Sequence, residues 1–150
     1  MILIAYDGSP DAQAAVDYAA RLMRGETATV LTVWEPYIER ASSTGAGAGL
    51  TSELVDHTAI DRAYEASAEA RAREGVERAA RAGLRAEPDV RARTTSVAAA
   101  ILAEADAVDA RAIVIGSRGL TGLKSVLLGS VSHAVVHHAH RPVILVPSPG

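Results

Sequence analysis

Short apolar, β-branched runs alternate along the whole chain with longer alanine-rich segments, and this alternation constrains the fold more than any other feature. The apolar runs occupy residues 2–6, 27–34, 112–115 and 142–147, and a weaker strand pattern that contains charged residues occupies 84–93. The segments between them have helical patterns, at residues 10–24, 55–82, 96–107 and 128–139. A continuous apolar run is typical of a strand buried on both faces. Strands that alternate with helices predict a parallel α/β sheet with right-handed crossovers and helices on both faces.

Local signals set the ends of these elements. Ser9 before Pro10 predicts a helix N-cap followed by proline at the first helical position. Thr95 or Ser96 is expected to cap a later helix in the same way. Gly75 weakens the middle of the long helical pattern, because glycine is a poor helix former. Pro88 lacks an N–H donor, so the run that contains it is expected to form an edge strand.

The length of 150 residues is usual for one domain, and we expect residues 1–150 to form a single domain. Residues 41–49 consist of small residues only, Ala-Ser-Ser-Thr-Gly-Ala-Gly-Ala-Gly. Such a composition cannot bury much apolar surface. It therefore predicts a flexible loop over about residues 36–54.

Charge and composition argue against several classes of function. The formal net charge of −3 disfavours nucleic-acid binding, which needs a basic surface. The chain has no cysteine, so it forms neither disulfides nor thiolate metal sites. Its first residues lack the basic region of a signal peptide, and no stretch approaches the roughly 18 apolar residues of a membrane span. We expect a cytoplasmic protein that does not contact membranes.

Several polar and glycine residues follow strands that are expected to be neighbours. Asp7 and Gly8 follow the first strand, Val33 lies near the end of the second, and Gly116-Ser117 follows the fourth. In open α/β sheets, ligands bind beyond the carboxyl ends of the strands. These residues are therefore expected to share one ligand-binding rim.

A glycine-rich segment at this rim has the features of a phosphate site. Gly116 and Gly119 frame a turn directly after a strand, and Gly129-Ser130 opens a helix. A helix N-terminus offers unpaired N–H groups and a partial positive charge to phosphate oxygens. The hydroxyls of Ser130 and Ser132 could add hydrogen bonds. The alternative is that the glycines only make tight turns and Ser130 only caps its helix.

Two common nucleotide motifs are absent. A P-loop requires lysine directly after its second glycine, whereas Leu123 separates Gly122 from Lys124. The dinucleotide pattern Gly-x-Gly-x-x-Gly fails as well, because Leu50 stands where the third glycine after Gly45 and Gly47 would be. The chain is therefore neither a Walker-type ATPase nor a nicotinamide-binding Rossmann domain.

The spacing Gly116-x2-Gly119-x9-Gly129-Ser130 resembles the ATP-binding signature of the universal stress protein family. Further similarity lies in Asp7-Gly-Ser-Pro10, Leu31-Thr-Val-Trp34 and the closing Arg141 to Pro147. The resemblance implies an open five-stranded parallel sheet in the order 3-2-1-4-5, of the adenine nucleotide alpha-hydrolase-like class. It also implies a homodimer formed through the last strand, residues 142–147. Bound ATP would carry Mg²⁺ or Mn²⁺ on its phosphates.

The resemblance also implies which residues hold the nucleotide. Asp7 and the backbone near Val33 would contact adenine, and Gly116 and Gly119 would border the ribose and phosphates. Arg118 could pair with phosphate or be solvated. The full set of expected nucleotide-binding residues is Asp7, Gly8, Ser9, Val33, Gly116, Ser117, Arg118, Gly119, Gly122, Gly129, Ser130, Val131 and Ser132.

We expect a protein whose conformation or partner binding changes with nucleotide occupancy during a stress response. Two alternatives remain, a slow ATP hydrolase and a nucleotide-free interaction dimer. No residue near the expected phosphates offers a strong general base, so any ATPase activity should be weak. The histidines His133, His137, His138 and His140 form a cluster on and after the last helix, where a solvated or dimer-facing position is favoured over a zinc site.

Overall fold

The structure is a computed structural model that describes residues 1–37, 56–119 and 128–147. The expected loop at about 36–54 lies almost wholly outside the described residues. The strands are β1 (Ile2–Ala5), β2 (Thr27–Trp34), β3 (Arg85–Ala92), β4 (Ile113–Gly116) and β5 (Val143–Val146). The helices are α1 (Pro10–Leu22), α3 (His57–Arg81), α4 (Val97–Ala107) and α5 (Ser130–His138).

All of these strands run parallel in one sheet of order β3-β2-β1-β4-β5. This arrangement confirms the parallel sheet that the alternating pattern predicts and the strand order that the family resemblance implies. β1 is central, paired with β2 on one side and β4 on the other. β3 is an edge strand, as expected from Pro88, whose missing N–H removes no ladder bond there.

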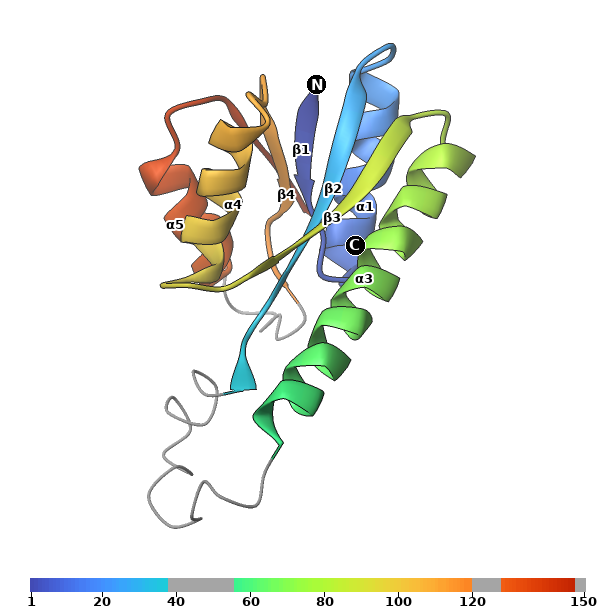
Figure 1. The fold of residues 1–150 in the computed structure, drawn as a ribbon. Coiled ribbons are helices and arrows are strands. Elements are labelled where there is room, and N and C mark those ends of the chain that lie inside the picture. The colour runs from blue at the N-terminus through green and yellow to red at the C-terminus, as the bar shows by residue number, and fades with distance from the viewer. Residues whose placement is uncertain (38–55, 120–127, 148–150) are drawn as a thin grey trace.

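Two layers of helices cover the two faces of the sheet (Figure 1). Alternate residues of β1 point to opposite faces, and nearly all of them are fully buried. Ile2 and Ile4 pack with α1 and α3 in one apolar core. Leu3 and Ala5 pack with α4 and α5 in the other. A strand buried on both faces needs a continuous apolar run, which is the pattern in the sequence.

Two helices, α1 and α4, begin at capping residues that the sequence suggests. The Ser9 hydroxyl accepts a hydrogen bond from the Ala12 N–H at 3.2 Å, and Pro10 is the first helical residue. Ser96, rather than Thr95, caps α4 through the Ala99 N–H. In the described ranges, no helix is both long enough and apolar enough to cross a membrane.

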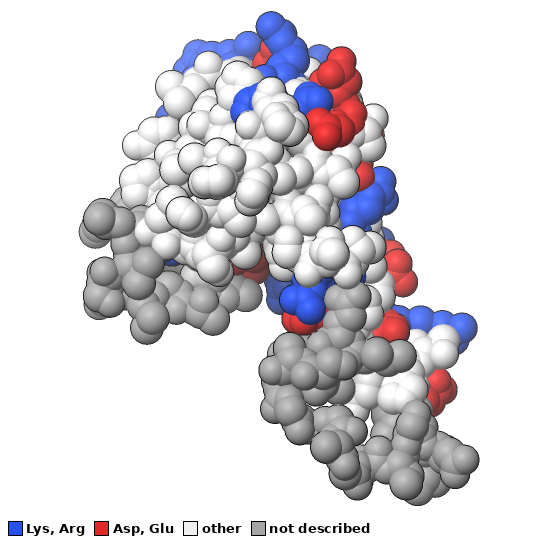
Figure 2. Space-filling view, turned by 90° about the vertical axis from the view of Figure 1, so that its left-hand side faces the viewer, with Lys and Arg blue, Asp and Glu red and all other residues white. Residues whose placement is uncertain are grey.

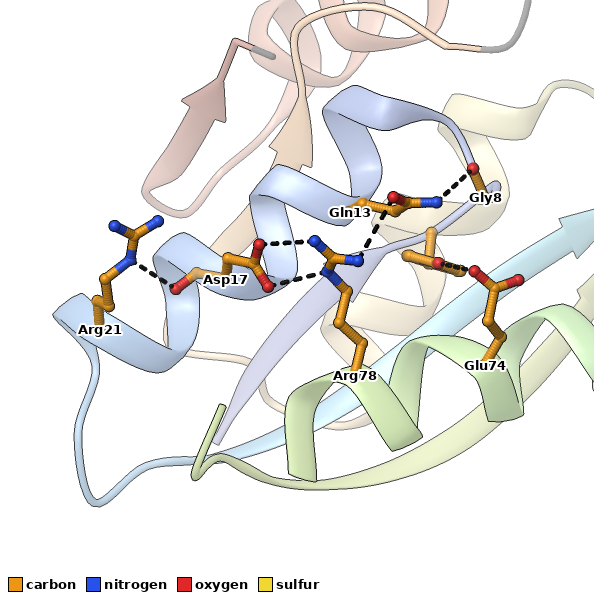
Figure 3. A network of polar contacts seen from close by, with 7 residues as sticks. Gly8, Gln13, Asp17, Arg21, Glu74 and Arg78 are labelled. Carbon is orange, nitrogen blue, oxygen red and sulfur yellow. Dashed lines mark hydrogen bonds and ion pairs between the residues drawn. The ribbon is translucent and has the colours of Figure 1, made fainter. Parts of the chain in front are cut away.

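A polar network joins α1 to α3 beside the turn that follows β1 (Figure 3). Arg78 donates to both carboxylate oxygens of Asp17, at 2.8 and 2.9 Å, and to the side-chain oxygen of Gln13 at 3.4 Å. Gln13 in turn donates to the Gly8 carbonyl. The hydrogen bond to Asp17 raises the pKa of Arg78. The network therefore fixes the first turn of the chain against the long helix.

Tyr6 extends the contact between the sheet and α3. Its hydroxyl donates to the Glu74 carboxylate at 2.7 Å. Burial and this hydrogen bond raise the pKa of the Tyr6 phenol well above its usual range. The phenol therefore stays protonated and continues to donate throughout the neutral range.

Candidate functional site

A pocket opens at the carboxyl ends of β1, β2 and β4, between the first turns of α1, α4 and α5. The position agrees with the rule for open α/β sheets. Nine of the residues expected to hold nucleotide line it: Asp7, Val33, Gly116, Arg118, Gly119, Gly129, Ser130, Val131 and Ser132. Segments separated by more than one hundred residues in the chain therefore meet at one site.

Asp7 lies at the end of β1 and faces the glycine turn that follows β4. One carboxylate oxygen accepts the Ser9 N–H at 2.9 Å, which shapes the turn into α1. The other lies 2.8 Å from the position that a Cβ would occupy on Gly119. A side chain at 119 would therefore require the Asp7 carboxylate to shift, so glycine at this position lets the carboxylate keep its place in the pocket.

Gly8 and Ser9 were expected to bind nucleotide, but they do not line the pocket. Gly8 adopts a φ of +82°, which favours glycine, and packs against the Arg71 side chain of α3. Ser9 is buried and its hydroxyl is engaged as the N-cap of α1. Both residues shape the turn that carries Asp7.

A buried carboxylate that the sequence pattern did not reveal organises the turn after β4. Asp11, on α1, is only 5% exposed. Its Oδ2 accepts hydrogen bonds from the Ser117 hydroxyl at 2.8 Å and from the Arg118 N–H at 2.9 Å. The Arg118 guanidinium donates to the same oxygen at 3.5 Å. Asp11 belongs to no recognised sequence motif. The one signal in the sequence is its position in the first turn of a helix.

The hydroxyls of Ser117 and Ser132 are directed toward the protein. Ser117 does not line the pocket, and its hydroxyl donates to Asp11. Ser132 is buried, and its hydroxyl lies 2.9 and 3.0 Å from the carbonyl oxygens of Gly116 and Ser117. The Ser117 carbonyl also accepts the Gly129 N–H at 2.7 Å. These bonds join the turn after β4 to the start of α5.

The N-terminus of α5 is the part of the pocket best suited to an anion. Gly129 is the N-cap, so it provides no side-chain hydrogen bond to the first turn. Ser130 begins the helix and is exposed, whereas the sequence pattern left open whether it would be the cap. The first N–H groups of a helix have no partner within it and carry a partial positive charge. Ser130, Val131 and Ser132, which form this first turn, all line the pocket.

The opposite wall of the pocket is apolar. Side chains from β2, α4 and β4 form it: Leu31, Val33, Val97, Ile101 and Ile115. Of these, only Val33 belongs to the expected set of nucleotide-binding residues. The others follow from topology, because the last residues of neighbouring parallel strands and the first turn of the next helix meet at one rim. A pocket with one apolar wall and one anion-binding wall suits a ligand that joins a flat ring system to a phosphate.

Two sequence expectations concern other regions. Gly122 lies outside the described residues. His133 and His137 stand with ring centroids 6.2 Å apart on the exposed side of α5, and His137 and His138 stand 4.8 Å apart. Over the described part of the chain, no group of three or more histidine, aspartate or glutamate side chains is placed to hold a metal ion.

Comparisons with known proteins give the same family that the glycine spacing resembles. The model of the universal stress protein family matches residues 1–147. The chain is 36% identical to a universal stress protein of Thermus aquaticus, covering 97% of this chain and 96% of that protein. It is 31% identical to the universal stress protein YxiE of Bacillus subtilis, covering 97% of each. In some curated relatives the chain spans less: 47% of a Mycobacterium tuberculosis protein and 34% of a Synechocystis one.

Solved structures share the fold over nearly the whole chain. The universal stress protein UspA from Lactobacillus plantarum has a TM-score of 0.74 at 23% identity, covering 97% of this chain and 95% of that one. The universal stress protein from Archaeoglobus fulgidus in complex with dAMP has a TM-score of 0.64 at 27% identity, with the same coverage. The fold, the placement of the glycine signature and the family match lead to one conclusion: the chain belongs to the universal stress protein family.

Proposed function

We propose that this protein binds adenine nucleotides, ATP among them, in the pocket at the carboxyl ends of the strands. The observation that carries the proposal is the N-terminus of α5, which has no capping side chain and lines a pocket with an apolar opposite wall. The base would lie against the apolar wall near Val33 and Asp7. The phosphates would meet the N–H groups of Ser130 and Val131.

A related protein whose structure contains a bound nucleotide supports this proposal. The Archaeoglobus fulgidus universal stress protein, 27% identical to this chain, has been solved in complex with dAMP. We extend the proposal to ATP because the glycine spacing matches the family's ATP-binding signature. Mg²⁺ or Mn²⁺ would be held through the phosphates. Nucleotide occupancy would then shift the protein toward whichever conformation binds nucleotide better, and so regulate its shape or its partners.

Calorimetric titration with AMP and ATP, with and without Mg²⁺, tests the proposal. Two variants block opposite ends of the pocket: Val33→Trp fills the apolar end, and Gly129→Val places a branched side chain at the start of α5. We expect each to lower nucleotide affinity at least about tenfold, equivalent to about 1.4 kcal/mol. Leu22→Trp, at the exposed end of α1, introduces the same bulk away from the pocket and should leave affinity unchanged.

Circular dichroism of each variant separates loss of binding from loss of fold. Failure of the wild-type protein to bind any of these nucleotides would overturn the proposal. Unchanged affinity in both pocket variants would show that nucleotide binds elsewhere.

We also propose that two copies associate through the last strand, residues 142–147. Within the described residues β5 is paired only with β4, so its other edge has unpaired backbone groups. Leu145 of β5 and Val136 of α5 are large apolar residues that remain exposed. Figure 2 shows a broad surface without lysine, arginine, aspartate or glutamate on the side of the molecule where α4 and α5 lie. An apolar edge of this kind favours pairing with a second copy.

A further inference from the structure

Among the described residues, the nucleotide pocket has a single cationic side chain in its lining, and that cation faces a buried anion. Arg118 lines the pocket, and its side chain is about one quarter exposed, at 28%. Its Nε lies 3.5 Å from the Oδ2 of Asp11, whose side chain is 7% exposed. The Arg118 guanidinium, which would meet phosphate, is therefore partly neutralised by the Asp11 carboxylate.

The same carboxylate oxygen also fixes the backbone at this point. It accepts the Arg118 N–H at 2.9 Å and the Ser117 hydroxyl at 2.8 Å, so the turn after β4 is attached to the first turn of α1. Close contact of the two elements places the carboxylate beside Arg118, which lines the pocket. A Cβ on Gly116 would lie 2.7 Å from the Asp11 Cβ, so only glycine at 116 allows α1 to approach β4 this closely.

We propose that Asp11 is a specificity-determining residue that sets how strongly the pocket attracts phosphate charge, by holding and neutralising Arg118. The inference rests on the proposed function of the pocket. In a low-dielectric environment, an opposing charge a few ångströms away cancels much of the attraction of a cation for a third group. Asp11 therefore moderates the preference for ATP over AMP and for AMP over adenosine, while leaving recognition of the base to the apolar wall.

Asp11→Asn tests this directly, because asparagine has the same shape and its side-chain oxygen can still accept from Ser117 and from the Arg118 N–H. Affinities for adenosine, AMP and magnesium-free ATP would be measured by calorimetry for the variant and the wild type. We expect adenosine affinity to remain within about twofold. AMP affinity should rise about threefold and ATP affinity about tenfold, since the gain scales with ligand charge. Added salt should reduce these gains.

Asp17→Asn is the matched control. Asp17 lies on the same helix and pairs with Arg78 of α3, which does not line the pocket. The substitution changes the net charge of the protein by the same amount. It should leave the ratio of ATP affinity to adenosine affinity unchanged, so that a general charge effect is distinguished from one at the site.

The role of Arg118 is tested by the same Asp11→Asn change in an Arg118→Gln background. There the gain in ATP affinity should shrink, because the released guanidinium is no longer present. An undiminished gain would mean that Asp11 does not act through Arg118, and the inference would be wrong.

Each remaining outcome has one meaning. If the wild type binds all three ligands and Asp11→Asn weakens adenosine and ATP by the same factor, Asp11 only supports the fold, and the inference fails while the proposed function stands. If wild-type protein binds none of the three, the proposed function itself fails. Should Asp11→Asn not fold, Arg118→Gln alone must lower ATP affinity and spare adenosine affinity, or the inference is rejected.

Discussion

Individual glycines show which features of the site the sequence could reveal. Gly25 and Gly83 adopt positive φ just after α1 and α3, where glycine commonly ends a helix, so local sequence can indicate their role. Gly116 and Gly119 are different, because their φ values are ordinary and their role is close packing against Asp11 and Asp7. Such contacts join residues about a hundred positions apart, so local sequence could suggest a turn but not the contact.

Gly116→Ala should destabilise the fold. The added Cβ would lie 2.7 Å from the carbonyl carbon of Asp11 and 2.9 Å from the Ala12 nitrogen, and helix backbone cannot move aside without displacing α1. Overpacking of this kind typically costs about 1–3 kcal/mol. Urea denaturation of the variant and the wild type measures the difference in free energy of unfolding.

Gly129→Ala provides the comparison. Its Cβ would meet nothing closer than 3.4 Å, and its φ of −69° suits alanine. We expect a cost of only about 0.5 kcal/mol, mostly from the weaker N-cap. Equal losses for the two variants would mean that the close approach of α1 to β4 does not limit residue 116.

At the scale of elements, the sequence predicted the extent of α3. It did not explain why the helix continues through Gly75. The pattern predicted a helix over 55–82, and the helix spans His57–Arg81 without a break at Gly75. Gly75 is buried and packs on the sheet: a Cβ there would lie 2.8 Å from the Val30 side chain and 3.1 Å from the Tyr6 ring. A residue that weakens a helix in isolation therefore allows this helix to lie close to β2.

Gly75→Ala tests which effect is larger. Alanine improves helix propensity by about 1 kcal/mol, whereas overpacking a buried contact costs about 1–3 kcal/mol. Because Val30 and Tyr6 are themselves buried and cannot turn away, we expect a net loss of stability, measured as a lower Tm. Ala80→Gly, on the exposed side of the same helix, should cost about 1 kcal/mol from propensity alone. A gain in stability for Gly75→Ala would show that the interface has room for a methyl group.

The contact between β3 and α4 contains an acidic pair that should respond to pH. Asp89 pairs with Arg91 at 3.0 Å, and buried Glu104 pairs with the same guanidinium at 2.6 Å. The Asp89 Oδ2 is buried and receives no hydrogen bond from any residue that the structure describes, and the Glu104 carboxyl faces it. A proton held between the two carboxyls would supply the missing donor. Burial raises the pKa of Asp89 and Glu104 raises it further, while Arg91 opposes the shift.

The sign of the pH effect follows from linkage. The folded protein holds this proton more tightly than the unfolded chain, so the stabilisation is present below the ordinary pKa of about 3.9 and is lost as pH rises through the raised value. Asp89→Asn supplies a permanent N–H donor. We expect the variant to be more stable than the wild type at pH 7, with the difference shrinking toward pH 4 in thermal melts. A variant less stable at pH 7 would mean that the ion pair with Arg91 outweighs the burial cost.

At the scale of the whole molecule, the alternation of strands and helices was enough to predict the parallel sheet and its two helical layers. The strand order came from the family resemblance, because periodicity does not say which parallel strands pair. The rim of the pocket was predictable from strand ends. Its apolar wall follows only once the strand order is known, because Val97 and Ile101 reach the pocket through the packing of α4 on the sheet.

Leu145→Lys tests the proposed association of two copies. Lysine on an edge strand opposes pairing because its charge would have to be buried. If β5 forms the interface, light scattering should show the wild-type dimer shifting to monomer, with dissociation favoured by at least about 2 kcal/mol. Val90→Lys, on the opposite edge strand β3, should leave the oligomeric state unchanged. A wild-type monomer, or a dimer unaffected by Leu145→Lys, would exclude this interface.

The central place of β1 sets the order in which this molecule can assemble during synthesis. The sheet grows in two directions from its first strand: β2 and β3 add on one side, and β4 and β5 add on the other only after residue 112 has been made. The early half can collapse around α1 and α3 while Leu3 and Ala5 still lack the cover of α4 and α5. The pocket needs Gly116 and the start of α5, so the proposed nucleotide could stabilise a nascent chain only after residue 130 has left the ribosome.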